Sequence, residues 1–314
     1  MYQTTLRHEV ACSGIGLHSG REVRLSLRPA PADAGVVFHI HVDGGVRQVF
    51  PSPEAVMATE LATTLGTADR VTVSTVEHLL AAVRGMGVDN LAIHVEGGEV
   101  PILDGSAAVF VQLFARAGIR QLSAPRRVLR VVRPFEFAEG DKRIRVTPYS
   151  GFRVDCTIDF PHPAIGRQRL VMDVTPAAFG RVASARTFGF LRDVEYLRSR
   201  GLALGGSLDN AVVLDEHGVI NPEGLRVPDE FVRHKVLDFI GDMAMLRLPL
   251  RGSFELVRSG HQFNNAFLRE LEANHLLREA EEWAEVEAER PAARRQGRRS
   301  PFRQGYAAPL SALA

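Results

Sequence analysis

The segment HKVLD places His234 and Asp238 four residues apart. On an α-helix, residues with this spacing share one face, so both side chains can reach a single metal ion. The same spacing also serves surface ion pairs and helix caps, which are its commoner uses. By itself, therefore, the segment permits a metal site without requiring one.

A second histidine follows a glutamate in TVEHLL, where Glu77 precedes His78 within an otherwise apolar stretch. A carboxylate next to a metal-binding histidine can reach a water molecule at the ion and accept its proton. The alternative is a partly buried histidine beside a glutamate that faces solvent. The local sequence favours that alternative.

Two further segments contain residues suited to catalysis. His261 follows Ser-Gly in RSGHQFNN, and a histidine in such a loop is a candidate acid or base. In SARTFGFLRD, Thr187 could hydrogen-bond a developing oxyanion and Phe188 could line an apolar slot. A catalytic zinc needs three protein ligands and one open position, so these residues together are compatible with a zinc hydrolase. They do not identify its substrate.

Strands and helices must bring these segments together. Alternating apolar residues predict strands, and apolar residues at helical spacing predict helices. The elements expected in the first half are strands from Val23 and Val36, a helix capped by Ser74 and ended by Gly85 and Gly87, a strand from Asp89, and a helix from Gly105 to Gly118. Those expected in the second half are a linker at Ser123–Arg127, strands in VLRVVRPFEF and RVDCTIDF, a helix from near Phe190, a strand from Asp209 and a helix capped by Asp229.

The two halves share an order of elements: helix, glycine, Asp-Asn, strand, loop, helix. The matching strands are DNLAIHV and DNAVVLD. We interpret this match as a weak internal repeat of two related α+β domains. The predicted boundaries are 1–124 for the first domain, 125–275 for the second, and 276–314 for a charged helix followed by a flexible, Arg-rich tail.

The chain has 314 residues, more than one hydrophobic core usually supports, which also favours two domains. A net charge of +1 argues against a nucleic-acid partner bound by bulk electrostatics. Cys12 and Cys156 form no CxxC motif, so we expect no disulfide framework. We find neither a signal peptide nor an apolar run long enough to cross a membrane. These features predict a cytoplasmic protein without stable membrane insertion.

Five longer segments carry a resemblance to a known family: STVEHLLAAVRGMGVDN, EVPILDGSAAVF, SARTFGFLRDVEYLRSRGLALGGSLDNAVV, DEFVRHKVLDFIGD and SGHQFNN. With GIGLHSG and LRPAPADAGVVF near the start, they closely resemble the UDP-3-O-acyl-N-acetylglucosamine deacetylases, zinc enzymes of lipid A biosynthesis in Gram-negative bacteria. The resemblance implies two similar α+β domains, each a helix layer on a β-sheet, with the active site between them. It also implies a reaction that removes acetate from the 2-acetamido group of a UDP-linked, 3-O-acylated glucosamine.

The resemblance assigns roles to individual residues. It places the zinc ligands at His78, His234 and Asp238, although this ligand set also suits Fe²⁺. The implied catalytic residues are Glu77 as general base, His261 as general acid, Lys235 as a stabiliser of the transition state, Thr187 facing the substrate carbonyl oxygen, and Asp242 supporting the loop histidine.

The resemblance also implies how the substrate is bound. Lys142 and Arg258 fall near the nucleotide diphosphate, and Phe160 could pack against the uracil. Ala203 and Leu208 could alter the width of the acyl passage, so the preferred acyl length stays open. The residues implied for that passage are Phe188, Val194, Ala203, Ser207, Leu208 and Val213.

Two other functions stay open on the sequence. One is a zinc hydrolase acting on a different N-acyl substrate. The other is a non-catalytic nucleotide-sugar binding protein, against which the intact Glu77 and His261 argue. The small, apolar ending APLSALA further suggests the hypothesis that a regulatory protease acts on the tail.

Overall fold

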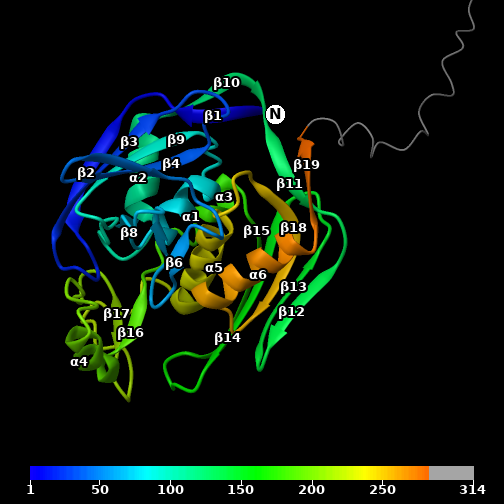
Figure 1. The fold of residues 1–314 in the computed structure, drawn as a ribbon. Helices are drawn as coiled ribbons and strands as arrows, with labels where there is room; N and C mark the ends of the chain where they lie inside the picture. Colours follow the sequence, from blue (N-terminus) through cyan, green and yellow to red (C-terminus); the bar gives the residue numbers. More distant parts are fainter. Residues whose placement is uncertain (283–314) are drawn as a thin grey trace, which may run out of the picture. The chain divides into compact units, whose positions relative to one another are not determined.

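Two β-sheets, one built by each half of the chain, frame the structure (Figure 1). The computed structural model describes residues 1–282, and Met1–Glu282 forms one compact unit. The hypotheses about the Arg-rich tail and its APLSALA ending therefore lie outside the described residues. Within residues 1–282, no helix is both long enough and apolar enough to cross a membrane.

The sheet of the first half has one covered face. Along one of its strands, Val23, Leu25 and Leu27 are buried while the residues between them are more exposed, which is the period-two pattern of such a sheet. Its strands lie in the spatial order β2 (Val10–Ile15), β3 (Glu22–Pro29), β9 (Leu91–Glu96), β4 (Val36–Val42) and β5 (Gly45–Val49). The strands predicted from Val23, Val36 and Asp89 are therefore confirmed.

The sheet of the second half has seven strands. They are β11 (Arg127–Val131), β12 (Phe135–Glu139), β13 (Lys142–Thr147), β14 (Phe152–Phe160), β15 (Gly166–Asp173), β18 (Leu250–Val257) and β19 (Leu277–Glu281). β18 is central, with β13 antiparallel to it and β14 parallel to it. β11 pairs with the start of β18, and β19 pairs with β11.

The two sheets share one topology. In the first, β9 is antiparallel to β3 and parallel to β4, and β2 and β5 lie outside them. In the second, β18 takes the place of β9, between β13 and β14, and β12 and β15 lie outside them. The chain therefore contains the repeat that the sequence suggested, in a different alignment.

The predicted match between DNLAIHV and DNAVVLD is wrong. DNLAIHV contains β9, whereas DNAVVLD contains β17 (Val212–Leu214), which pairs with β16 (Phe188–Phe190) in a separate two-stranded sheet. The true counterpart of β9 is β18. Asp and Asn favour turns, and the Asp-Asn pair precedes a strand in both segments. The pair therefore indicates a local turn and does not indicate which strand of a sheet follows.

Equivalent helices flank the two central strands. α1 (Glu77–Gly85) precedes β9 and α2 (Ala108–Ala117) follows it, just as α5 (Glu230–Met243) precedes β18 and α6 (His261–Ala273) follows it. Figure 1 shows α1 and α5 between the two sheets. Both helices are buried on nearly every side, as expected for helices covered by layers on both faces.

The predicted helix caps are only partly correct. α1 ends at Gly85 as predicted, and Gly87 has φ +72°, but the helix begins after Val76. Ser74 is not its cap, because the Ser74 backbone bonds to Gly98 and Val100 in extended chain. Asp229 does stand at the cap position of α5, yet its carboxylate accepts a hydrogen bond from Arg233.

Two predicted elements at the ends of the second half are wrong. The linker Ser123–Arg127 is almost entirely strand, because β10 (Ile119–Pro125) pairs with β1 (Tyr2–Leu6) and Arg127 opens β11. The charged helix predicted at the start of 276–314 is wrong, because Leu277–Glu281 forms β19; the part of the prediction beyond Glu282 lies outside the described residues. β11 offers this segment an edge to pair with, whereas a short, isolated helix is only marginally stable because its nucleation is unfavourable.

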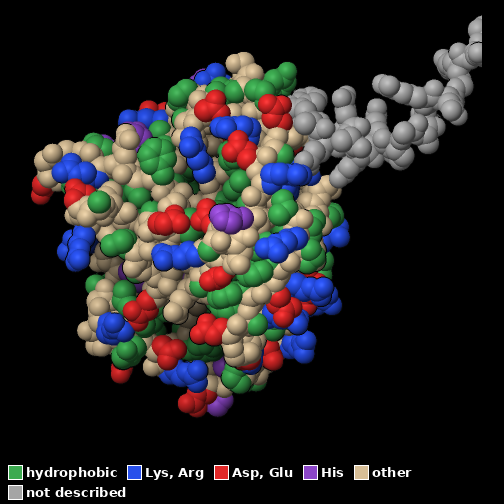
Figure 2. Space-filling view, turned by 45° about the vertical axis from the view of Figure 1, so that its right-hand side comes forward, with side chains coloured by type: hydrophobic (Ala, Val, Ile, Leu, Met, Phe, Trp, Pro, Cys, Tyr) green, Lys and Arg blue, Asp and Glu red, His purple; other side chains and the backbone are tan. Residues whose placement is uncertain are grey.

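The remaining elements are short. They are α3 (Pro176–Phe179), α4 (Leu191–Ser199) and the three strands β6 (Val56–Ala58), β7 (Thr64–Gly66) and β8 (Thr72–Val73) of one small sheet. α4 confirms the helix predicted near Phe190. On the face drawn in Figure 2, Lys and Arg side chains are interspersed with Asp and Glu, as the small net charge suggests.

Candidate metal centre

Helices α1 and α5 supply the core of the centre. α1 carries Glu77 and His78 in its first turn. α5 carries His234, Asp238 and Asp242 at successive four-residue steps, which places the three side chains on one face of the helix. The structure therefore brings HKVLD and TVEHLL together, although His78 and His234 are 156 positions apart in the sequence.

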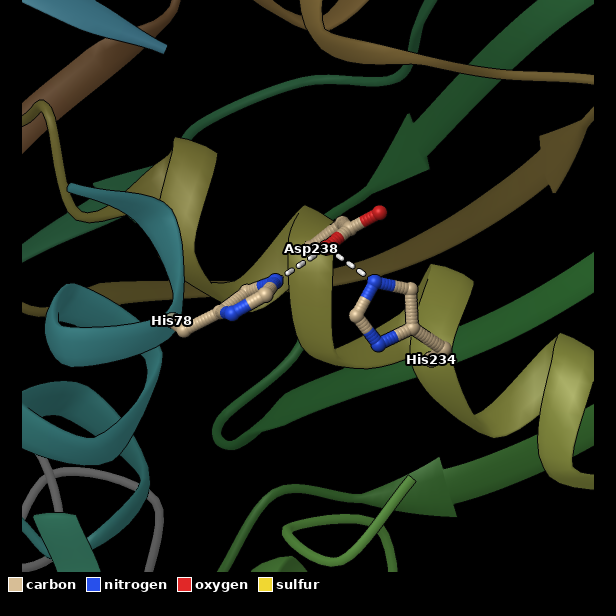
Figure 3. A group of neighbouring side chains, drawn as sticks. All are labelled: His78, His234 and Asp238. Carbon is tan, nitrogen blue, oxygen red and sulfur yellow. Dashed lines mark ion pairs between the residues drawn. The ribbon is translucent and has the colours of Figure 1, made fainter. Parts of the chain in front are cut away.

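His78, His234 and Asp238 converge on one point (Figure 3). Nε2 of His234 lies 3.1 Å from Oδ1 of Asp238, and Nε2 of His78 lies 3.6 Å from the same oxygen. All three ligand atoms lie within 4.8 Å of one another, and the three residues are at most 4 % exposed. Two imidazoles and one carboxylate in this arrangement are a ligand set for a single divalent cation.

The protonation of His234 supports a cation at this point. Its Nδ1 donates a hydrogen bond to the carbonyl oxygen of Ala185 at 3.1 Å, so in the neutral ring the lone pair is on Nε2. That lone pair faces Oδ1 of Asp238, a buried oxygen that accepts no hydrogen bond from the described residues. Two buried lone pairs facing each other are unfavourable unless a cation lies between them. The residues present therefore fit a metal ion.

Glu77 lies beside this ligand set and is 3 % exposed. Burial raises the pKa of its carboxyl group. One of its oxygens, Oε2, accepts a hydrogen bond from the backbone N–H of Thr63 at 3.0 Å. The other oxygen is left as a proton acceptor, which is what a general base needs.

Asp242 orients the ring of His261. Nδ1 of His261 donates to Oδ2 of Asp242 at 2.9 Å, and Nε2 lies 3.8 Å from Oδ2 of Asp238, on the side of the metal ligands. Burial opposes the charged ring, but Asp242, with Asp238 and Glu77, raises the pKa of His261 to about 9. A cation held by His78, His234 and Asp238 would lower this pKa again, because it would lie close to the ring.

The ammonium group of Lys235 lies between the carboxylate of Asp238 and the aromatic ring of Phe188. Its Nζ donates to Oδ2 of Asp238 at 2.8 Å and lies 5.7 Å from the centre of the Phe188 ring. Burial alone would raise the pKa of Asp238, yet neighbouring positive charge, that of Lys235 included, holds it well below its usual range. Phe188 in turn contacts the ring of Phe160, 5.6 Å away between centroids. The predicted Lys235, Phe188 and Phe160 are thus brought together with the metal ligands.

The position of Thr187 is fixed by its own backbone hydrogen bonds and by the ion pair of the preceding residue, Arg186. Its N–H donates to Gly105 and its carbonyl accepts from Val212, both at 2.8 Å. The preceding Arg186 is 2 % exposed and donates through Nε to Glu230 at 2.9 Å, in the first turn of α5. This buried ion pair connects the segment that carries Thr187 to the helix that carries two of the candidate metal ligands.

The two predicted diphosphate cations lie farther out, at one end of the seven-stranded sheet. Lys142 opens β13 and is exposed, while Arg258 directly follows β18. The guanidinium of Arg258 is already engaged, because it forms an ion pair with Asp141 and donates to the carbonyl oxygen of Asp159. Binding of a diphosphate by Arg258 would compete with the Asp141 ion pair.

The residues predicted for the acyl passage share one segment, 188–213, which comprises β16, α4 and β17. No residue of α4 is buried, and Leu208 in the following loop is 37 % exposed. Ala203 has φ +54°, and its N–H donates to Nδ1 of His18 at 3.4 Å. The structure places Val194, Ser207 and Val213 in the same segment, and their contact with an acyl chain stays a prediction.

Sequence reasoning missed three residues that contact the centre. They are Thr63, Ala185 and Asn264, which bond to Glu77 and Asp242, to His234, and to Asp242. Ala185 acts through its backbone carbonyl, which no side-chain pattern can reveal. Asn264 stands three residues after His261 in SGHQFNN, so its place one turn along α6 was the only available signal.

Gly241 sets the distance between the two helices of the centre. A Cβ atom at this position would lie 2.1 Å from the carbonyl oxygen of Glu77, so only glycine allows this approach. We expect Gly241→Ala to push α1 and α5 apart and to weaken metal binding by about 10–100-fold, because the ligands come from both helices. A competitive chelator titration would measure this change. Gly218→Ala is the matched control, since a Cβ at Gly218 meets nothing within 4 Å, and equal affinities in both variants would contradict the prediction.

The centre has the composition of a mononuclear metal-dependent hydrolase: three ligands, an adjacent carboxylate and a histidine held by a second carboxylate. Comparison with known proteins gives the family. The family model described as UDP-3-O-acyl N-acetylglycosamine deacetylase (LpxC) matches residues 3–273, and the chain belongs to that family.

Relatives that share this name cover nearly the whole chain. A UDP-3-O-acyl-N-acetylglucosamine deacetylase of Nitratidesulfovibrio vulgaris is 59 % identical over 94 % of this chain and 97 % of its own length. Proteins of the same name from Oleidesulfovibrio alaskensis and Lawsonia intracellularis are 58 % and 55 % identical, each over 88 % of this chain and 91 % of its own length.

Proposed function

We propose that this protein hydrolyses the 2-acetamido group of UDP-3-O-(3-hydroxyacyl)-N-acetylglucosamine and releases acetate, an early step of lipid A biosynthesis. Its membership of the deacetylase family, at up to 59 % identity, carries the proposal. The buried group of His78, His234 and Asp238, with Glu77 beside it, supplies chemistry suited to amide hydrolysis.

The bound ion would be Zn²⁺, held by His78, His234 and Asp238. Two imidazoles and a carboxylate suit Zn²⁺, and Fe²⁺ is the alternative because it accepts the same ligands. When bound, the ion supplies Lewis-acid polarisation of the amide carbonyl and of the attacking water. Metal analysis of protein purified without added metal would distinguish the two ions.

The residues around the ligands would handle protons and charge. Glu77 accepts the proton of the attacking water at the oxygen that Thr63 does not engage. Lys235 and Thr187 stabilise the negative charge that develops on the carbonyl oxygen. His261, held through Nδ1 by Asp242, donates a proton from Nε2 to the nitrogen that leaves.

The rest of the substrate would extend in two directions from this centre. The acyl chain would pass along the segment 188–213, where Leu191, Tyr196 and Leu208 leave apolar surface exposed. The nucleotide would lie toward Phe160, Lys142 and Arg258. Because the proposed substrate is linked to a nucleotide, the enzyme would act in the cytoplasm.

We further propose that the two halves are two related domains, with the boundaries 1–124 and 125–275. The shared strand order around β9 and β18 supports this division. Because β19 belongs to the second sheet, the second domain would extend to Glu281.

Acetate release is the direct test of the proposed activity. The zinc-loaded protein is expected to release acetate from the UDP-linked, 3-O-acylated substrate and not from free N-acetylglucosamine. Release from simple N-acyl compounds would favour a hydrolase of another substrate class. Binding of the UDP sugar without acetate release would instead favour a non-catalytic binding protein.

A further inference from the structure

Thr63 contacts both carboxylates that flank the metal ligands. It is 2 % exposed and lies immediately before β7, in the first half of the chain. Its backbone N–H donates to Oε2 of Glu77 at 3.0 Å, and its hydroxyl donates to Oδ1 of Asp242 at 2.8 Å. A single buried residue of the first half therefore holds the proposed base and also the carboxylate that supports the proposed acid.

The hydroxyl of Thr63 helps to fix the plane of the Asp242 carboxylate. Oδ1 accepts from Thr63, and Oδ2 accepts from Nδ2 of Asn264 at 2.7 Å. These two donors come from opposite halves of the chain, and each engages a different oxygen. With both oxygens held, the carboxylate cannot rotate freely, so the direction in which it accepts from Nδ1 of His261 is also fixed.

We infer that Thr63 is a positioning residue for the reaction. Its hydroxyl orients Asp242, and through Asp242 it orients the ring of His261, so that Nε2 faces the leaving nitrogen. Its backbone N–H holds Glu77 at the same time. The inference rests on the proposed function, because it assumes that His261 and Glu77 transfer protons during amide hydrolysis.

Thr63→Val tests the inference because valine keeps the shape and the backbone N–H while removing the hydroxyl. We expect kcat to fall about 10-fold, with KM changed by less than about twofold and the metal content unchanged. Thr63→Ser restores the hydroxyl and is expected to recover most of the lost kcat. Circular dichroism and thermal melting of both variants show whether they are folded.

Thr64→Val is the matched control. It makes the same chemical change one residue later, where the hydroxyl donates to Ser74 at 3.0 Å and not to the centre. We expect its kcat to equal that of the unmodified protein. A fall in kcat as large as that of Thr63→Val would mean that loss of any hydroxyl in this region suffices, and would overturn the inference.

A double-mutant cycle separates positioning from general destabilisation. In the background of Asp242→Asn, Thr63→Val is expected to lower kcat by less than about twofold further, because the group it positions is already altered. If the two substitutions lowered kcat independently, so that their effects multiplied, the inference would be overturned. It would also be overturned by a folded Thr63→Val variant with unchanged kcat, or by a folded Thr63→Ser variant that recovers none of the lost kcat. If the unmodified protein releases no acetate at all, the proposed function fails first, and the failure is visible before any variant is compared.

Discussion

Glu77→Gln is expected to lower kcat by about 10²–10⁴-fold while the metal ion stays bound, the range usual for loss of one general base. Glutamine keeps the size of the side chain and can still accept the hydrogen bond from Thr63 through its amide oxygen. It cannot take a proton from water at neutral pH. Acetate release and metal content, measured on the same samples, would test both halves of the expectation.

Glu54→Gln is the matched control for this variant, because it makes the same chemical change at another glutamate. Glu54 is a glutamate of the same half and lies outside the metal centre. We expect that variant to retain activity and metal. If Glu77→Gln lost its ion as well as its turnover, Glu77 would be a ligand, and its assignment as the base would be wrong.

His234→Ala is expected to lose both the ion and the activity. Zinc binding by four protein ligands is worth about 10–16 kcal/mol, or about 2.5–4 kcal/mol per ligand, so loss of one ligand is expected to raise Kd by about 10²–10³-fold. The variant also removes the hydrogen-bond donor to the carbonyl oxygen of Ala185, while Nε2 of His78 still lies near Oδ1 of Asp238. Metal analysis after dialysis, together with acetate release, measures the loss.

His217→Ala is the control for this variant. His217 is exposed and belongs to a turn outside the centre, so its removal is expected to leave one ion per chain and full activity. Retention of a tightly bound ion by His234→Ala would contradict the assignment of the ligands. Restoration of activity by excess Zn²⁺ would instead be consistent with it, because weakened binding is overcome by concentration.

Much of the fold could be predicted from the sequence because its signals are local. Alternation predicted β3 and β4, glycines predicted the end of α1, and helical spacing predicted α4 and α5. The errors occurred where partners distant in sequence decide the outcome. Leu277–Glu281 became a strand because β11 offered it an open edge, and the true counterpart of β9 is set by strand pairing across the second sheet.

The sequence by itself determined which residues could form the centre: HKVLD places two candidate ligands on one helical face, and Glu77 stands next to a third. What only the tertiary structure decided is how these residues meet. Gly241 lets α1 and α5 approach closely enough for His78 to face Asp238, and Ala185 directs the lone pair of His234 toward the same point. These effects depend on backbone atoms and on packing between distant segments, whose positions no local pattern of side chains specifies.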